Sequence, residues 1–241
     1  MKEEVISYQF DNQTFNGFAV FPDHKEKAPA ILIAHAWMGQ QEFFKEKARA
    51  LAKLGYVGFC ADVYGKLAND IDEAKKLMMP LFNNRPLLLK RIQAAYHTMK
   101  SLDGVDQDKL GGIGYCFGGT TILELFKSGV DLKGVVTFHG GLANPEKGPI
   151  NPIAKEIKGS VLILHGYEDP LVSSNDLQRT LKELEEANID WQAHIYGHTL
   201  HAFTDPKASK PEMGLKYNQL SSERAWLEMK FFFRELFEGD L

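Results

Sequence analysis

The sequence is poor in cysteine, in long apolar runs and in excess charge of either sign. Its 241 residues include only two cysteines, Cys60 and Cys116, which excludes a disulfide framework, and a reducing compartment would keep both as thiols. The net charge is −4 and the basic residues are scattered, so no basic stripe is available to bind nucleic acid. No apolar run is long enough to cross a bilayer, and the first residues are acidic and alternating where a signal peptide would be basic and then apolar. We therefore expect a cytoplasmic protein with no nucleic-acid or membrane partner.

Metal-ligand spacing is missing as well. The eight histidines form no His-Glu-x-x-His motif, and the cysteines form no Cys-x-x-Cys motif. We expect no metal and no other cofactor. His139 follows a predicted strand, where it can border a site, but a histidine satisfied by the backbone is the simpler explanation. Cys60, inside another predicted strand, is expected to be a buried core thiol.

The sequence does contain an alternation of apolar strands and amphipathic helices. Hydrophobic residues make up 44% and charged residues 25%, the balance of a globular chain that buries a sizeable core. Two opening strands flank the turn-forming Asp11-Asn12-Gln13, which predicts a hairpin. Later strands alternate with helices, as in a parallel sheet with right-handed crossovers. The eight predicted strands span residues 5–10, 14–21, 30–34, 56–63, 110–115, 134–138, 161–164 and 191–196.

The hairpin followed by parallel crossovers predicts an α/β-hydrolase fold, with a mostly parallel eight-stranded sheet flanked by helices. A TIM barrel, the alternative for parallel strands, alternates strictly and has no opening hairpin. We expect one domain over residues 1–241. The segment 64–101 is polar and less regular up to a helix beginning near Leu87, and it is a candidate for a cap or lid.

The stretch that carries the chemistry is Gly114-Tyr115-Cys116-Phe117-Gly118, where a strand runs into a helix. This Gly-x-Cys-x-Gly pattern is that of a nucleophile elbow with sulfur in place of oxygen. The turn is so sharp that the nucleophile adopts a strained backbone conformation, and the flanking glycines avoid collisions with neighbouring chain. The N-terminus of the following helix and a nearby imidazole would favour the thiolate form of Cys116, which is the nucleophile.

A nucleophile elbow needs an acid after a late strand and a histidine after the last strand. The first position offers Glu168 and Asp169, and the second offers His198 and His201. Asp169 precedes a proline at a turn, where backbone donors can hold a short carboxylate, so we favour it over Glu168 as the orienting acid. His201 lies farther into its loop than His198, next to an anchoring phenylalanine, so we favour it as the base.

The stretches 114–119, 165–169 and 201–203 have the sequences GYCFGG, HGYED and HAF. They resemble the motifs of the dienelactone hydrolase (carboxymethylenebutenolidase) family, and the resemblance extends over nearly the whole chain. It implies an α/β-hydrolase that cleaves an ester or lactone through a Cys-His-Asp triad. Carried over position by position, the triad falls on Cys116, His201 and Asp169.

Acyl transfer also needs hydrogen-bond donors for the developing oxyanion. The elbow supplies the backbone N–H of Phe117, and the loop after the strand 30–34 should supply the N–H of Trp37. We expect the side chains of both residues to shape the pocket.

Two departures from the family's pattern bear on the substrate. The family's glutamate near the nucleophile corresponds here to Ala36, and the arginine that tends to follow the histidine motif is replaced by Thr204-Asp205. Because burying a carboxylate without a cation is costly, we expect a small neutral ester or lactone beside Ala36 and Trp37, unless Arg85 reaches in. An acyltransferase on the same triad and a catalytically silent ligand-binding protein are the alternatives. The oligomeric state is left open between monomer and homodimer.

Overall fold

The centre of the protein is one eight-stranded sheet, seen in a computed structural model that describes residues 1–23, 27–142 and 152–239. The strand order is β1-β2-β4-β3-β5-β6-β7-β8, in which β1 pairs antiparallel with β2 and β2 pairs antiparallel with β4. The other neighbouring strands are parallel. The strands are β1 (Lys2–Phe10), β2 (Gln13–Phe21), β3 (Ala28–Ala34), β4 (Val57–Cys60), β5 (Val105–Tyr115), β6 (Gly134–Phe138), β7 (Ser160–Gly166) and β8 (Trp191–Tyr196).

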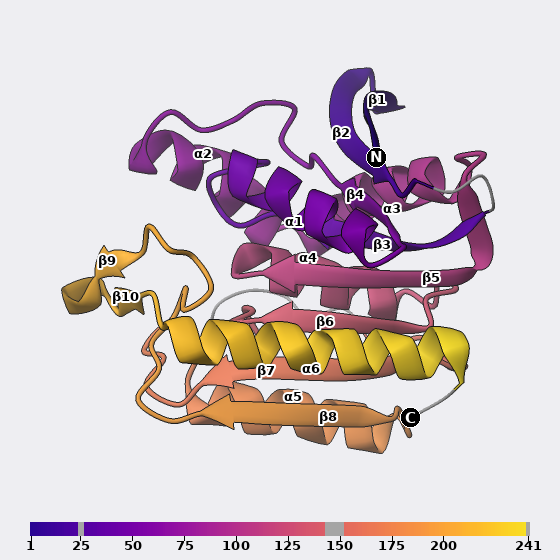
Figure 1. Ribbon diagram of the computed structural model, residues 1–241. Helices are drawn as coiled ribbons and strands as arrows, with labels where there is room; N and C mark the ends of the chain where they lie inside the picture. Colours follow the sequence, from indigo (N-terminus) through magenta and orange to yellow (C-terminus); the bar gives the residue numbers. More distant parts are fainter. Residues whose placement is uncertain (24–26, 143–151, 240–241) are drawn as a thin grey trace.

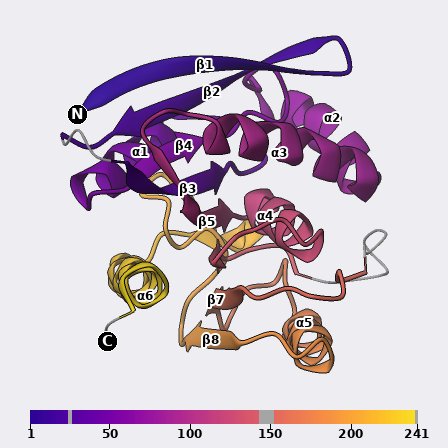
Figure 2. The ribbon, with the colours of Figure 1, turned by 90° about the vertical axis from the view of Figure 1, so that its right-hand side faces the viewer.

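Helices cover both faces of this sheet (Figure 1 and Figure 2). On one face lie α1 (Glu42–Lys53) and α6 (Gln219–Glu238), and on the other lie α3 (Arg85–Lys100), α4 (Phe117–Lys127) and α5 (Ser174–Glu186). Each face has its own apolar cluster, and strands β3, β6 and β7 are buried along nearly their whole length. Burial on both faces explains the continuous apolar runs of these strands, since a one-sided sheet would show alternation.

The opening hairpin turns at the residues that the sequence indicated. Asp11 and Asn12 both have positive φ, 49° and 59°, which is the conformation of a two-residue type I′ turn. Short polar side chains tolerate this conformation because they can hydrogen-bond to the local backbone. The chain therefore reverses with Phe10 directly opposite Gln13.

Strand β4 is shorter than the predicted strand 56–63, because it ends at Cys60. Beyond it, Asp62 Oδ1 accepts hydrogen bonds from the backbone N–H groups of Tyr64 and Gly65, at 2.9 and 2.8 Å. A side chain that bonds its own following backbone replaces the ladder of the sheet with a turn. The chain thus leaves the sheet earlier than the apolar run suggested.

The segment after this turn contains a helix that the sequence analysis did not predict, α2 (Ile71–Phe82). Its N-cap is Asp70, whose Oδ1 accepts a hydrogen bond from the N–H of Glu73 at 2.8 Å. The signal was present in the sequence as Asp-x-x-Glu, but Pro80 near the end of the helix weakened the pattern.

The carboxyl ends of the parallel strands gather at the end of the molecule to which the arrowheads of β5 to β8 point (Figure 1). Helix α2 and a small antiparallel sheet of β9 (Ser209–Lys210) and β10 (Leu215–Lys216) lie at this same end. Ligands of open α/β sheets bind outside the carboxyl ends of the strands. A movement of residues 64–101 as a lid over this end stays a prediction.

The opening hairpin, the strand order and the helices on both faces together define the predicted α/β-hydrolase fold. Across residues 1–23, 27–142 and 152–239, no helix has the length and apolar character needed to span a membrane.

Candidate active site

Cys116 lies in the sharp turn between β5 and α4. Its backbone has φ 55° and ψ −118°, a conformation that side-chain-bearing residues rarely adopt. The residue is the N-cap of α4 and remains partly exposed, whereas its neighbours on both sides are buried. The predicted strained elbow is therefore present, with the sulfur at the N-terminal end of a helix.

Three glycines make room for this turn. A Cβ on Gly114 would lie 2.0 Å from the carbonyl oxygen of Gly118. A Cβ on Gly118 would lie 2.1 Å from the carbonyl oxygen of Ala34, and one on Gly119 would lie 2.3 Å from the Cα of Gly140. Because these neighbours are backbone atoms that cannot move aside, glycine is a steric requirement at all three positions.

His201 and Asp169 form a buried pair from two different loops. Nδ1 of His201 and Oδ2 of Asp169 are 2.7 Å apart, and the side chains are 3% and 0% exposed. The other carboxylate oxygen of Asp169 accepts hydrogen bonds from the N–H groups of Leu171 and Val172, at 2.9 and 3.1 Å. The N–H of Lys216, in β10, donates to the carbonyl of His201. Both partners are thus held from outside the pair.

Charges around His201 favour its protonated form. Burial by itself would lower the pKa of His201, but the negative charge of Cys116 and the carboxylate of Asp169 together raise it to about 10. Nε2 of His201 is buried and has no partner with hydrogen-bond geometry among the described residues. Cys116 raises the pKa of this imidazole first through its negative charge and further through a side-chain interaction with the ring.

The two competing candidates of the sequence analysis pair with each other at the surface. Nδ1 of His198 lies 3.2 Å from Oε1 of Glu168, and the two side chains are 98% and 47% exposed. A pair so exposed is screened by water and orients nothing in the interior. The structure thus brings Asp169 and His201 together in the interior and leaves their neighbours outside.

Of the two backbone donors proposed for the oxyanion, Phe117 is the first residue of α4 at the elbow, and Trp37 lies in the loop after β3. The end of β3 contacts it directly, since the carbonyls of Ala34 and His35 abut Gly118. The N–H groups of Trp37 and Phe117 donate to no other described residue. Both are therefore free to bind a ligand. Ala36, predicted to contact substrate, is half-buried in the same loop as Trp37.

Arg85 begins α3 and is buried, at 5% exposure. Its guanidinium lies over the Phe82 ring at 4.3 Å, and Nη1 is 4.0 Å from a carboxylate oxygen of Glu124 in α4. Nε and Nη1 have no hydrogen-bond partner among the described residues. Burial lowers the pKa of Arg85, and Glu124 opposes that effect. The cation thus faces an internal carboxylate.

His139 is a neighbour of His201 that the sequence analysis set aside. The two rings meet edge to face with centroids 4.9 Å apart, and Nε2 of His139 is 2.8 Å from Thr204 Oγ1. The expectation that the backbone satisfies His139 is wrong, because its partner is a side chain and its Nδ1 has none among the described residues. Burial and the positive charge of His201 lower the pKa of His139 well below its usual value.

Two more histidines at strand ends were not singled out by the sequence analysis. His165 in β7 and His35 after β3 are buried, and burial lowers the pKa of each. Their position at the carboxyl ends of parallel strands was the available signal. In the described part of the chain, no three histidine, cysteine or acidic side chains form a group that could hold a metal ion.

Cys60 is fully buried in β4, as expected for a core thiol, and burial raises the pKa of its thiol. It is therefore kept neutral and closed to solvent, unlike the partly exposed Cys116.

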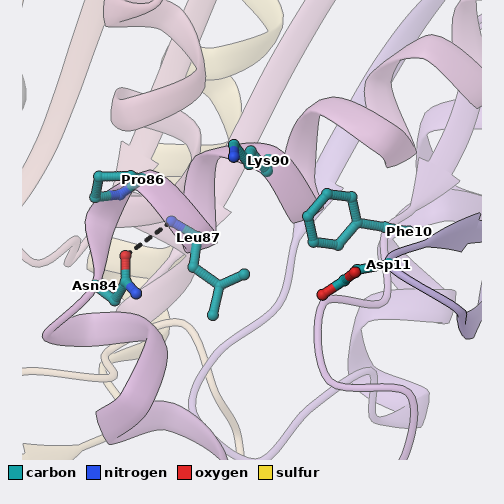
Figure 3. Close-up of a pocket in the computed structure, with 6 residues that line it drawn as sticks. All are labelled: Phe10, Asp11, Asn84, Pro86, Leu87 and Lys90. Carbon is teal, nitrogen blue, oxygen red and sulfur yellow. Dashed lines mark hydrogen bonds between the residues drawn. The ribbon is translucent and has the colours of Figure 1, made fainter.

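A surface cavity of about 470 Å³ lies between the turn after β1 and the start of α3 (Figure 3). It is lined by Phe10, Asp11, Asn84, Pro86, Leu87 and Lys90, and by none of the predicted site residues. The charged groups on its wall, Asp11 and Lys90, are exposed to water. It lacks the buried polar groups that fix a ligand in a pocket.

The strained turn at Cys116 and the buried pair of His201 and Asp169 match the pattern expected of an α/β-hydrolase. The chain belongs to the dienelactone hydrolase family, whose model matches residues 15–237. It is accordingly an ester or lactone hydrolase of that family.

Individual relatives match over almost their full length. Protein usf of Aquifex pyrophilus is 26% identical and is aligned over 96% of this chain and 98% of its own. The solved structure of m3DLH is 37% identical with a TM-score of 0.90, and it covers 98% of both chains. A dienelactone hydrolase-like promiscuous phosphotriesterase from metagenomic libraries is 31% identical with a TM-score of 0.92, again over 98% of both chains.

Proposed function

We propose that the protein hydrolyses small neutral esters or lactones through a triad of Cys116, His201 and Asp169. The observation that carries this proposal is the buried His201–Asp169 pair, 2.7 Å apart, beside a cysteine held in the strained turn of an elbow. A buried carboxylate that orients an imidazole, which in turn faces a nucleophile, is the arrangement needed for acyl transfer.

In this mechanism the Cys116 thiolate attacks the carbonyl carbon, and the N–H groups of Phe117 and Trp37 bind the oxyanion that forms. His201, protonated in the resting site, gives its proton to the leaving oxygen as the thioester forms. The neutral imidazole then removes a proton from water, which attacks the thioester and releases the acid. Asp169 holds the ring in one orientation and stabilises its charged form throughout.

The preference for a neutral substrate follows from the charges near the elbow. The guanidinium of Arg85 faces the carboxylate of Glu124, so the charge of this cation is already opposed. Ala36 and Thr204 add no charge, and Thr204 is bonded to His139. A substrate carboxylate beside Ala36 and Thr204 would be desolvated without a charge from Arg85 to pair with it, which is costly.

The first test of the triad is substitution of its nucleophile. Cys116→Ala is expected to lower kcat/KM for a neutral aryl ester by several orders of magnitude, since removal of a triad nucleophile costs about 10⁶-fold in the best-studied case. Cys60→Ala is the matched control, because it removes the other thiol from the interior of β4. Full activity in Cys116→Ala, with its identity checked by mass, would end the triad proposal.

The substrate preference has its own test. We expect kcat/KM for a neutral lactone or ester to exceed that for a carboxylate-bearing analogue of similar size, and Arg85→Ala to leave this order unchanged. A preference for the acidic analogue that disappears in Arg85→Ala would instead identify Arg85 as a carboxylate anchor.

Two alternative functions use the same fold. An acyltransferase would show faster product formation when an alcohol or thiol acceptor is added, with the acyl group found on the acceptor. A silent binding protein would turn over no member of a broad ester panel. Hydrolysis to the free acid with a rate independent of added acceptors excludes both.

A second activity is favoured by one observation, the 31% identity over 98% of both chains with a promiscuous phosphotriesterase. Donors placed for an anionic carbonyl oxygen also suit an oxygen on phosphorus. We propose slow hydrolysis of neutral phosphotriesters at Cys116. Multiple turnovers of an aryl phosphotriester that vanish in Cys116→Ala would support it, and a single stoichiometric labelling of the thiol would exclude it.

A further inference from the structure

A buried tyrosine lies next to the elbow and has no role in the mechanism above. Tyr64 follows β4 in the turn that Asp62 caps, and its backbone N–H donates to Asp62 Oδ1 at 2.9 Å. Its carbonyl accepts a hydrogen bond from Gln13 Nε2 at 3.0 Å. The residue is 3% exposed. Its backbone is therefore held from two sides.

The ring of Tyr64 packs among the residues that supply the oxyanion donors. It stacks on the ring of Phe117 with centroids 6.1 Å apart and 25° between the planes. It meets the ring of His35 edge to face at 4.7 Å. Trp37 packs against the same apolar cluster, which contains both Tyr64 and Phe117. The side chain thus lies between the loop after β3 and the first residue of α4.

The hydroxyl of Tyr64 is buried and has no hydrogen-bond partner in the described chain. This is unusual, because a buried hydroxyl without a partner costs free energy and needs an explanation. At Tyr8 such a group is satisfied: its hydroxyl donates to the carbonyl of Asp62 and accepts from the N–H of the same residue. Burial, and next the negative charge of Cys116, raise the pKa of Tyr64, so its hydroxyl keeps its proton.

Two other tyrosine hydroxyls are also buried without a partner, those of Tyr115 and Tyr196. The ring of Tyr115 stacks on Phe138 in the cluster on the opposite face of the sheet. Burial raises the pKa of both, with no contribution from Cys116 in either case. Of the three, Tyr64 is the one whose ring stacks on Phe117, the residue that follows the nucleophile.

We propose that Tyr64 is a catalytic residue whose hydroxyl donates a hydrogen bond to the oxyanion formed when Cys116 adds to a carbonyl. The inference rests on the proposed function. As the carbon–sulfur bond forms, the carbonyl electron pair moves onto oxygen, which Tyr64 then binds together with the N–H groups of Trp37 and Phe117. When the carbonyl reforms, the bond to the leaving oxygen breaks, and the tyrosine proton never leaves its hydroxyl. A donor left unpaired in the free enzyme is preorganised for charge that appears only during the reaction.

The test is Tyr64→Phe, which keeps the stacked ring and deletes only the hydroxyl. We expect kcat for a neutral aryl ester to fall about 10- to 100-fold, which is at or below the smallest loss usually seen when one oxyanion donor is removed. KM and the thermal midpoint of unfolding should change little. Tyr196→Phe is the matched control, since it deletes another buried hydroxyl without a partner. It should leave kcat unchanged.

Two probes of the thiol separate a donor to the oxyanion from a structural role. Iodoacetamide alkylates Cys116 as the carbon–iodine bond breaks, and no oxyanion forms, so its rate and pH profile should be the same in Tyr64→Phe. Phenyl trifluoromethyl ketone adds to the thiolate and produces an oxyanion, so its affinity should weaken about 10- to 100-fold, in step with kcat.

Unchanged hydrolysis and unchanged ketone affinity in Tyr64→Phe would overturn the inference while leaving the triad intact. A parallel loss of alkylation would also overturn it, because a distorted site slows every reaction of the thiol. A wild-type protein that is alkylated but neither hydrolyses esters nor binds the ketone would overturn the proposed function first, and the inference with it.

Discussion

Replacing Asp169 by asparagine tests the proposed triad without changing the shape of the site. Asp169 Oδ2 and His201 Nδ1 are 2.7 Å apart in a pair that is 0% and 3% exposed, so water cannot replace the lost charge. The asparagine amide can also present its NH₂ group to Nδ1. That nitrogen would then have to accept, which moves the ring proton to Nε2, the nitrogen that must exchange protons with the thiol and the substrate.

The expected size of the effect follows from this burial. A hydrogen bond to a charged group contributes about 1.5–3 kcal/mol, and the wrong tautomer adds to the loss. The equivalent change in a serine protease triad lowers kcat about 10⁴-fold. Because a thiolate is intrinsically more reactive than an alcohol, we expect a loss of about 10²- to 10⁴-fold here, or about 3–5.5 kcal/mol. KM should change little, since Asp169 does not face the substrate.

The assay is steady-state hydrolysis of a neutral aryl ester, with Glu168→Gln as the matched control. Glu168 is the residue preceding Asp169, and its carboxylate pairs with the exposed His198, an interaction worth about 0–1 kcal/mol. Its variant should keep nearly full activity. If Asp169→Asn kept more than about a tenth of kcat, or if Glu168→Gln lost as much, the buried pair would not be the working one.

Three further predictions concern the elbow, the thiols and pH. Gly118→Ala should destabilise the protein by more than the about 1–3 kcal/mol typical of overpacking, because its Cβ would lie 2.1 Å from a backbone oxygen, whereas Gly197→Ala, with open space around it, should be nearly silent in urea titrations. Iodoacetamide should label the partly exposed Cys116 before the fully buried Cys60, and peptide mapping that found the reverse order would contradict the assignment of the nucleophile. The pKa of His201 is raised to about 10 in the fold, so its protonated form should contribute stability in full below about pH 6.5 and lose it as the pH rises through about 10. Urea titrations across this pH range should show that the free energy of unfolding falls more in the wild type than in His201→Gln. If the two proteins lost stability in parallel as the pH rose, the raised pKa of His201 would be refuted.

Much of the fold was predictable because its signals are local. The apolar runs of β3, β6 and β7 indicated strands buried on both faces, and the structure covers both faces with helices. Asp11 and Asn12 marked the hairpin turn. The errors arose where one side chain outweighed the hydrophobic pattern. Asp62 ends β4 early because it accepts hydrogen bonds from the backbone that follows, and helix α2 was not predicted because Pro80 lies inside it.

The candidate catalytic residues were predictable only as far as the order of nucleophile, acid and histidine along the chain restricts each role to one loop. The elbow motif predicted the strained turn that the structure has at Cys116, and the loops after β7 and β8 each offered two candidates. Neighbours such as Glu168 and Asp169 have the same chemistry in sequence, and the arguments that separated them relied on turn geometry. His139 was assigned a backbone partner, but it contacts Thr204 and the ring of His201 from loops far apart in the chain.

The sequence by itself determined which segments form most of the strands and helices, the strained turn at Cys116 and the need for glycine around that turn. These features follow from periodicity and backbone sterics, which act between residues close in the chain. Only the tertiary structure decided that Asp169 and His201 turn inward while Glu168 and His198 pair in water. It also decided that Arg85 faces Glu124 and that the hydroxyl of Tyr64 is left without a partner. Burial and pairing between distant segments depend on how the strands and helices pack, and no local pattern encodes which side of a loop faces the interior.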